Sequence, residues 1–167
     1  MDSDSKTILL VEDDRNDVFF LQFAFEEARV VNPLQVVTDG QQAVDYLAGR
    51  GAYADRGRFP FPGLVLLDLK LPVRMGLDVL RWIRQQAELQ TLLVVVLTSS
   101  CEPCDIAEAY RLGARSYLIK PITVADRLVL AKAIKRYWID LNRSPEPGNL
   151  PQLRNSTALA LLKGFSA

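Results

Sequence analysis

Short apolar runs alternate along the chain with longer stretches in which apolar residues recur at helical spacing. Continuous apolar runs that end in polar residues are typical of parallel strands buried on both faces. They predict strands at residues 7–11, 33–37, 64–67, 92–97 and 117–119. The periodic stretches predict helices over residues 15–30 and 104–112, after Asp39-Gly40, after Gly76, and from Thr123 onward. This alternation predicts an α/β fold whose five-stranded parallel sheet is doubly wound, with helices on both faces.

The C-terminal part of the chain divides into the last predicted helix and a tail. The helix places five apolar residues along one side: Leu130, Ile134, Tyr137, Trp138 and Leu141. We expect the first two to face the core, so the apolar end of the helix is a candidate interface. Prolines and a glycine follow Asn142 and indicate an extended linker. We therefore expect one domain over residues 1–142 and an extension over residues 143–167 that is too short to fold alone.

Composition limits the possible functions. Lys and Arg total 20, Asp and Glu total 20, and there is no histidine. The balanced charge gives no reason to expect DNA or an anionic membrane as a partner. The apolar run at 92–97 is too short to span a bilayer, and the acidic N-terminus is unlike a secretory signal, so we expect a cytoplasmic protein. Without histidine, Ser-His-Asp or Cys-His catalysis and a His-bearing zinc site are excluded.

Polar residues suited to phosphoryl chemistry stand at the ends of four predicted strands. Glu12 and Asp13 follow the first strand, Asp68 the third, Thr98 ends the fourth and Lys120 follows the fifth. Ligands of open α/β sheets bind at the carboxyl ends of the strands, so we expect these side chains to meet. Carboxylates suit Mg²⁺ and can attack a phosphoryl donor, while an ammonium and a hydroxyl can bind phosphoryl oxygens. The pattern predicts a phosphoryl acceptor site that uses Mg²⁺, with Asp68 as the nucleophile.

Several of these residues also have plainer interpretations. Asp13 and Asp14 could cap the following helix, and we expect Asp14 to do little else. Cys101 and Cys104 form a CxxC pair at the start of a predicted helix, where a thiol can become reactive. A structural zinc site needs four ligands, and the chain has no further cysteine or histidine. We interpret the pair as two ordinary reduced thiols.

Four separated segments resemble the receiver domain of two-component response regulators. They are Ile8–Asp14, Leu66–Pro72 followed by Gly76, Val96–Thr98 and Tyr117–Pro121. The resemblance runs from Thr7 to about residue 141 in the order of the family, and four motifs together are far more specific than one. It implies the flavodoxin-like receiver fold and a phosphoacceptor signalling protein rather than an enzyme. Only Mg²⁺-dependent self-phosphorylation and autodephosphorylation would be expected of such a protein.

The resemblance also implies a role for each matching residue. Asp68 would be phosphorylated, and Asp13 would bind the metal together with Glu12, Asp68 and the backbone carbonyl of Lys70. Lys120 would contact the phosphoryl group, and the bond from Lys120 to Pro121 would be cis. Thr98 and Tyr117 would be the switch pair, the hydroxyl moving to the phosphoryl group as the ring turns inward.

A closer likeness is to the single-domain response regulators of cyanobacterial and bacterial phytochromes. It rests on the segments Tyr53–Gly57 and Pro60–Pro62 of the long loop and on Tyr137-Trp138 near the end of the last helix. This likeness implies a sensor histidine kinase, a phytochrome, as phosphoryl donor. No DNA-binding output is encoded, so we expect signalling through proteins. We also expect a homodimer that uses the last helix and the C-terminal extension, with Tyr137, Trp138 and Leu141 in the contact.

Three other classes compete with this interpretation. A haloacid-dehalogenase-like phosphatase also uses an Asp after a parallel strand, but it carries a second Asp two residues later, where this chain has Lys70. A flavodoxin-like nucleotide or flavin binder would be expected to show a glycine-rich phosphate loop, and no such loop follows any predicted strand here. A pseudo-receiver that serves only as a scaffold would not need the full set of acceptor residues.

Overall fold

Five parallel strands form one sheet in the order β2-β1-β3-β4-β5, in a computed structural model that describes residues 6–142. The strands are β1 (Ile8–Val11), β2 (Leu34–Val37), β3 (Leu64–Leu67), β4 (Leu93–Thr98) and β5 (Ser116–Ile119). All five predicted strands are confirmed, with ends that move by no more than about one residue. The order reverses between β1 and β3, which is where sheets of this kind bind ligands.

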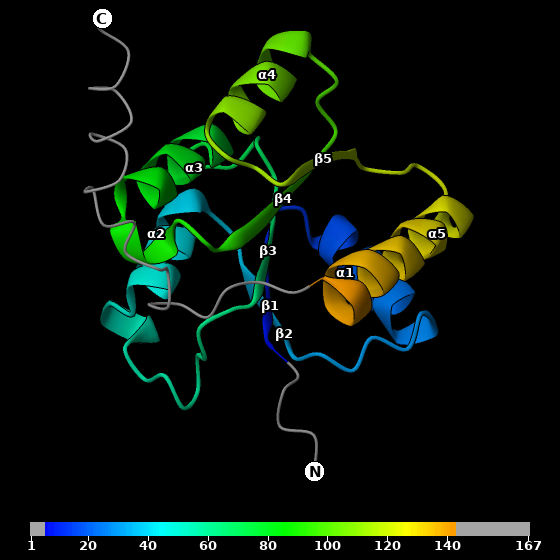
Figure 1. Ribbon diagram of the computed structural model, residues 1–167. Helices are drawn as coiled ribbons and strands as arrows, with labels where there is room; N and C mark the ends of the chain where they lie inside the picture. Colours follow the sequence, from blue (N-terminus) through cyan, green and yellow to red (C-terminus); the bar gives the residue numbers. More distant parts are fainter. Residues whose placement is uncertain (1–5, 143–167) are drawn as a thin grey trace, which may run out of the picture.

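Five helices cover both faces of the sheet. They are α1 (Arg15–Glu27), α2 (Gly40–Ala48), α3 (Gly76–Gln85), α4 (Pro103–Arg111) and α5 (Val124–Ile134). Two single turns of 3-10 helix, η1 (Gly51–Tyr53) and η2 (Ala87–Leu89), lie in the connections. Figure 1 shows α1 and α5 side by side on one face and α2, α3 and α4 on the other. The predicted doubly wound α/β architecture is confirmed.

The core has two halves, one on each face of the sheet. Successive side chains of a strand point to opposite faces, so each buried strand contributes to both halves. Leu9 and Val11 of β1 pack in the cluster that α2 and α3 close, whereas Ile8 and Leu10 pack in the cluster that α1 and α5 close. β1 and β3 are therefore apolar along their whole length, and polar residues appear only where they end.

The first helix is shorter than its apolar periodicity predicts. Asp14 caps its N-terminus by accepting hydrogen bonds from the N–H groups of Asn16 and Asp17. The helix ends at Glu27 rather than Val30, because Arg29 adopts a left-handed conformation with φ 57°. Its N–H still bonds the carbonyl of Glu26, which closes the last turn.

The sequence pattern assumes one helical geometry as far as residue 141, but the last helix changes its geometry before that point. α5 ends at Ile134 and continues as a π-helical segment, η3 (Lys135–Leu141). A π-helix turns less per residue than an α-helix, so its side chains do not follow the same stripe. Tyr137 and Leu141 are exposed, whereas Trp138 packs partly against the cluster of α1 and α5. The expectation that all five apolar residues share one side is wrong.

The long loop before β3 is held by one arginine. The guanidinium of Arg56 donates hydrogen bonds of 2.8 Å to the carbonyls of Tyr46 and Leu47 at the end of α2. The ring of Tyr46 is completely buried beside Tyr53 and Phe59, and its hydroxyl donates to the carbonyl of Pro60. The loop therefore has its own small aromatic core.

No helix within residues 6–142 combines the length and the hydropathy needed to cross a membrane.

Candidate functional site

The carboxyl ends of β1 and β3 bring three carboxylates together. Oxygen atoms of Glu12, Asp13 and Asp68 all lie within 4.8 Å of one another. The backbone sets this arrangement, because the N–H of Asp68 bonds the carbonyl of Val11 at 3.1 Å across the sheet. Glu12 and Asp68 are buried, and Asp13 is exposed. Within residues 6–142 this is the one group of potential metal ligands so placed, and its hard oxygen atoms fit a divalent cation.

Lys120 reaches the cluster from the end of β5. Its backbone N–H bonds the carbonyl of Thr98 at 2.8 Å, which places the side chain beside the ends of β4 and β3. The ammonium lies 2.6 Å from Oδ2 of Asp68, 2.6 Å from Oε2 of Glu12 and 3.0 Å from Oδ2 of Asp17. Burial alone would lower the pKa of Lys120, but its hydrogen bonds to Asp68 and Glu12 outweigh burial and raise it. The lysine is therefore a fixed cation at this edge of the sheet.

Glu12 and Asp14 have different tasks although they are close in sequence. Burial raises the pKa of Glu12 above its ordinary value, and the hydrogen bond with Lys120 opposes that effect. Its Oε1 accepts a hydrogen bond from the N–H of Asp14 at 3.2 Å, and its Oε2 contacts the Lys120 ammonium. Asp14 is used as the helix cap, as expected, and is not part of the three-carboxylate cluster.

The turn after Asp68 orients its carboxylate. Oδ1 accepts the N–H of Leu69 at 2.6 Å and that of Lys70 at 3.3 Å, while Oδ2 is bound by Lys120. Lys70 thus lies in this turn, and its side chain points to solvent. Gly76 begins α3 directly against the turn, because a Cβ atom there would stand 2.2 Å from the carbonyl oxygen of Asp68. Only glycine allows α3 to approach the end of β3 this closely.

The two residues expected to form the switch are linked through Ser100. Thr98 is fully buried, and its Oγ1 accepts the N–H of Ser100 at 3.3 Å. The hydroxyl of Tyr117 donates to the carbonyl of Ser100 at 2.9 Å. Asp105 of α4 accepts a hydrogen bond from the Ser100 hydroxyl. A change at Thr98 therefore has a short path to the ring of Tyr117 and to α4.

Two details of the sequence interpretation need correction or completion. The bond between Lys120 and Pro121 is not cis, since residues 6–142 contain no cis peptide bond. The trans chain still brings the Lys120 ammonium to Asp68. Cys101, in the loop before α4, and Cys104, in the first turn of α4, are free and exposed, in agreement with two reduced thiols.

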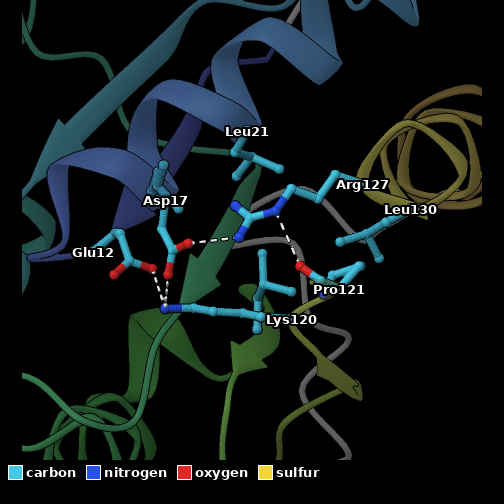
Figure 2. Close-up of a pocket in the computed structure, with 9 residues that line it drawn as sticks. Glu12, Asp17, Leu21, Lys120, Pro121, Arg127 and Leu130 are labelled. Atoms are coloured by element: carbon cyan, nitrogen blue, oxygen red, sulfur yellow. Dashed lines mark hydrogen bonds and ion pairs between the residues drawn. The ribbon is translucent and has the colours of Figure 1, made fainter. Parts of the chain in front are cut away.

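Sequence reasoning missed Asp17 and Arg127. Asp17 lies on the first turn of α1 and Arg127 on α5, and they form an ion pair at 2.9 Å. The only sequence signal for Asp17 is its place one helical turn after Asp13, and no motif points to Arg127. Figure 2 shows how the pair reaches Lys120.

The amino-acid sequence is similar to those of known response regulators. Residues 8–133 match the family model of the response regulator receiver domain. The chain is 39% identical over 140 residues to the probable methanogenesis regulatory protein FilR2 of Methanothrix harundinacea, with 84% of this chain and 88% of FilR2 covered. It is 34% identical over 135 residues to the response regulator Rcp1 of Synechocystis, with 81% and 90% covered.

Two crystal structures resemble the whole described fold. The phosphorylated cyanobacterial phytochrome response regulator RcpA is similar with a TM-score of 0.78 at 34% identity, covering 84% of this chain and 98% of RcpA. The Mn²⁺-bound form of Rcp1 is similar with a TM-score of 0.76 at 34% identity, covering 84% and 99%. The predicted resemblance to phytochrome response regulators is confirmed. This chain belongs to the response regulator receiver domain family and is a two-component response regulator.

Proposed function

We propose that Asp68 accepts a phosphoryl group from a sensor histidine kinase. The observation that carries the proposal is the placement of the Lys120 ammonium 2.6 Å from Asp68, beside a cluster of three carboxylates. An oxygen of Asp68 forms a bond to phosphorus while the bond from phosphorus to a phosphohistidine nitrogen of the kinase breaks. The electron pair of the broken bond leaves with the imidazole. Lys120 then neutralises charge on a phosphoryl oxygen, which is the main requirement of this transfer.

We propose that Glu12, Asp13, Asp68 and the carbonyl of Lys70 hold Mg²⁺. When bound, the ion would neutralise the carboxylates and the charge on the phosphoryl oxygens. Two of the carboxylates are buried and already share one ammonium, and the third is open to solvent. A site with more acids than cations favours an additional cation. Mn²⁺ in the related Rcp1 structure supports a divalent ion of this kind.

We propose that Thr98 and Tyr117 carry the phosphorylation state to the protein surface. The Thr98 hydroxyl would turn to a phosphoryl oxygen and give up its contact with the N–H of Ser100. Because Tyr117 is bonded to the carbonyl of the same Ser100, movement of that residue would change the position of the ring. The output would act through partner proteins, without DNA binding.

The likeness to RcpA supports a phytochrome as the kinase. We also propose that the protein acts in the cytoplasm. We further propose a homodimer. Tyr137 and Leu141 are 58% and 55% exposed at the end of the last helix. The extension expected at residues 143–167 follows in the sequence and lies outside the described residues. Trp138 is the weakest of the three candidates because it already packs against its own core.

Labelling with acetyl phosphate tests the acceptor. With Mg²⁺, the protein should gain one phosphoryl group that is stable in acid and labile in base, with acetate as the leaving group. Asp68→Asn should abolish the label, and equal labelling of that variant contradicts the assignment. Purified phytochrome kinases, tested under alternating light, identify the donor.

Light scattering tests the dimer. The full chain, a truncation after Asn142 and the double variant Tyr137→Ser/Leu141→Ser should separate the contributions of the extension and of the helix end. A full chain that stays monomeric at high micromolar concentration, phosphorylated or not, excludes the homodimer.

A further inference from the structure

Asp17 and Arg127 lie outside the motifs of the chain, yet both belong to the charged network of the site. We propose that Asp17 is a positioning residue for Lys120 and that Arg127 holds Asp17 in place. Asp17 fixes the ammonium from the side of α1, so that Lys120 presents its other two N–H groups to Glu12 and Asp68. This proposal rests on the proposed role of Lys120 in phosphoryl transfer.

The donors and acceptors at Lys120 match in number. An ammonium has three N–H groups and no acceptor, on a flexible four-carbon stem. Three carboxylates from three elements surround it, with Glu12 and Asp68 at 2.6 Å and Asp17 at 3.0 Å. Removal of Asp17 would free one N–H group and leave the ammonium without its contact to α1. The other two contacts alone would not define its position as well.

Arg127 connects Asp17 back to the chain segment that carries Lys120. One guanidinium nitrogen donates to Oδ1 of Asp17 at 2.9 Å, and Nε donates to the carbonyl of Pro121 at 3.0 Å. The guanidinium also lies 5.1 Å from the ring centre of Phe20 on α1. Figure 2 shows the result, a closed circuit from Lys120 through Asp17 and Arg127 to Pro121. The circuit fixes both the side chain of Lys120 and the backbone that follows it.

The surroundings strengthen these contacts. A small cavity of about 20 Å³ adjoins the network and is lined by four of its charged residues, by Pro121 and by four leucines, Leu10, Leu21, Leu97 and Leu130. The side chains of Lys120, Arg127 and Asp17 are only 11%, 17% and 25% exposed. Charged hydrogen bonds shielded from water are stronger and more directional than exposed ones. The network is therefore able to hold a geometry rather than only to balance charge.

A simpler role for Asp17 would be that of an acid at the N-terminus of α1, where it favours the helix dipole. That role needs no cation partner. Here each oxygen of the carboxylate binds a different cation, and both cations come from the other end of the chain. The two roles make different predictions once Lys120 is removed.

The test is a kinetic double-mutant cycle on the full chain, with acetyl phosphate as donor and saturating Mg²⁺. Asp17→Asn should slow phosphorylation of Asp68 about tenfold, because misplaced groups lose much of their catalytic effect. In a Lys120→Ala background the same substitution should have no further effect, since its target is gone. Arg127→Gln should slow the reaction about threefold, and Arg127→Lys should recover part of the loss. The Mg²⁺ concentration for half-maximal rate should stay within about twofold in the Asp17 and Arg127 variants.

Glu108→Gln is the matched control, because Glu108 is also a carboxylate held by two cations, Arg81 and Arg111, from two helices. It should phosphorylate at the wild-type rate. A full Asp17→Asn effect in the Lys120→Ala background, or no effect in the wild-type background, overturns the inference. If Lys120→Ala itself phosphorylates normally, the proposed function of Lys120 fails instead. Circular dichroism checks the fold of each variant. If Asp17→Asn does not fold, Arg127→Gln and Arg127→Lys test the proposal by the same criteria, with the substitution placed on α5.

Discussion

Two groups of charged side chains connect helices of this protein, and they differ in how far solvent reaches them. In the first, Asp17 of α1 binds Lys120 and Arg127, whose side chains are 11% and 17% exposed. In the second, Glu108 of α4 binds Arg81 of α3 and Arg111 of its own helix, and these arginines are 47% and 67% exposed. The distances are similar, from 2.6 to 3.3 Å, so geometry alone does not separate the two groups.

Burial decides what each group can do. Asp17 pays a desolvation cost, which alone would raise its pKa, and its hydrogen bonds to Lys120 and Arg127 more than offset that cost. The hydrogen bond to Arg111 lowers the pKa of Glu108, but both arginine partners are exposed to solvent and salt, which screen the interaction. A shielded network next to a reacting group can control positions, whereas an exposed one contributes little to stability. The following four experiments test this contrast.

The largest effect is expected when the cation of the site is removed. Lys120→Met leaves Glu12 and Asp68 buried without their shared partner, which should lower the free energy of unfolding by about 3 kcal/mol. Mg²⁺ should restore part of this loss and stabilise the variant more than the wild type, because a bound ligand stabilises the folded state. Urea unfolding with and without Mg²⁺ measures both effects. Arg81→Met is the control, and equal destabilisation of the two variants would contradict the contrast.

Asp13→Asn should have the next largest effect, on the metal. It removes one charged oxygen ligand at the exposed edge of the cluster, so Mg²⁺ affinity should fall about tenfold with the fold intact. Isothermal titration measures the affinity. Asp14→Asn is the matched neighbour, because Asn caps a helix as well as Asp does, and it should bind Mg²⁺ like the wild type. Unchanged affinity in Asp13→Asn would remove Asp13 from the metal site.

The third experiment uses pH. The pKa of Asp17 is lowered in the folded protein, so the stability it contributes is present above its unfolded pKa and is lost as pH falls through the folded pKa. Wild type and Asp17→Asn should differ by about 1 kcal/mol in unfolding free energy at pH 7. The difference should shrink below about pH 4. Chemical unfolding at a series of pH values gives the curve, and a constant difference from pH 7 to pH 3 would argue against an ionic role for Asp17.

The smallest effect is expected for Glu108→Gln. Its urea midpoint should equal that of the wild type, and salt should not change the comparison, because solvent already screens the contacts with Arg81 and Arg111. A clear loss of stability would show that the α3–α4 contact does more than its exposure indicates.

The sequence predicted those parts of the molecule that follow from local patterns. Apolar runs that end in Glu12, Asp13, Asp68 and Lys120 located the strand ends, and parallel pairing brings such ends together. Asp17 and Arg127 were missed because their contact spans 110 positions and belongs to no periodic pattern. The prediction that five apolar residues share one side of the last helix was wrong. It assumed a constant rotation per residue, and the π-helical segment has a different rotation. The cis bond came from family resemblance alone.

The edge-on pair of Tyr137 and Trp138, with ring centres 4.8 Å apart, has a practical consequence for spectroscopy. The chain has only two tryptophans, and the other, Trp82, packs on α3 against the cluster of the opposite face. Neither belongs to the carboxylate cluster or to the network around Lys120. Tryptophan fluorescence should therefore be nearly silent to cation binding but sensitive to anything that covers the end of the last helix. A Trp82→Phe protein would carry a single tryptophan at that end, and the emission wavelength of this tryptophan would report association without any attached dye.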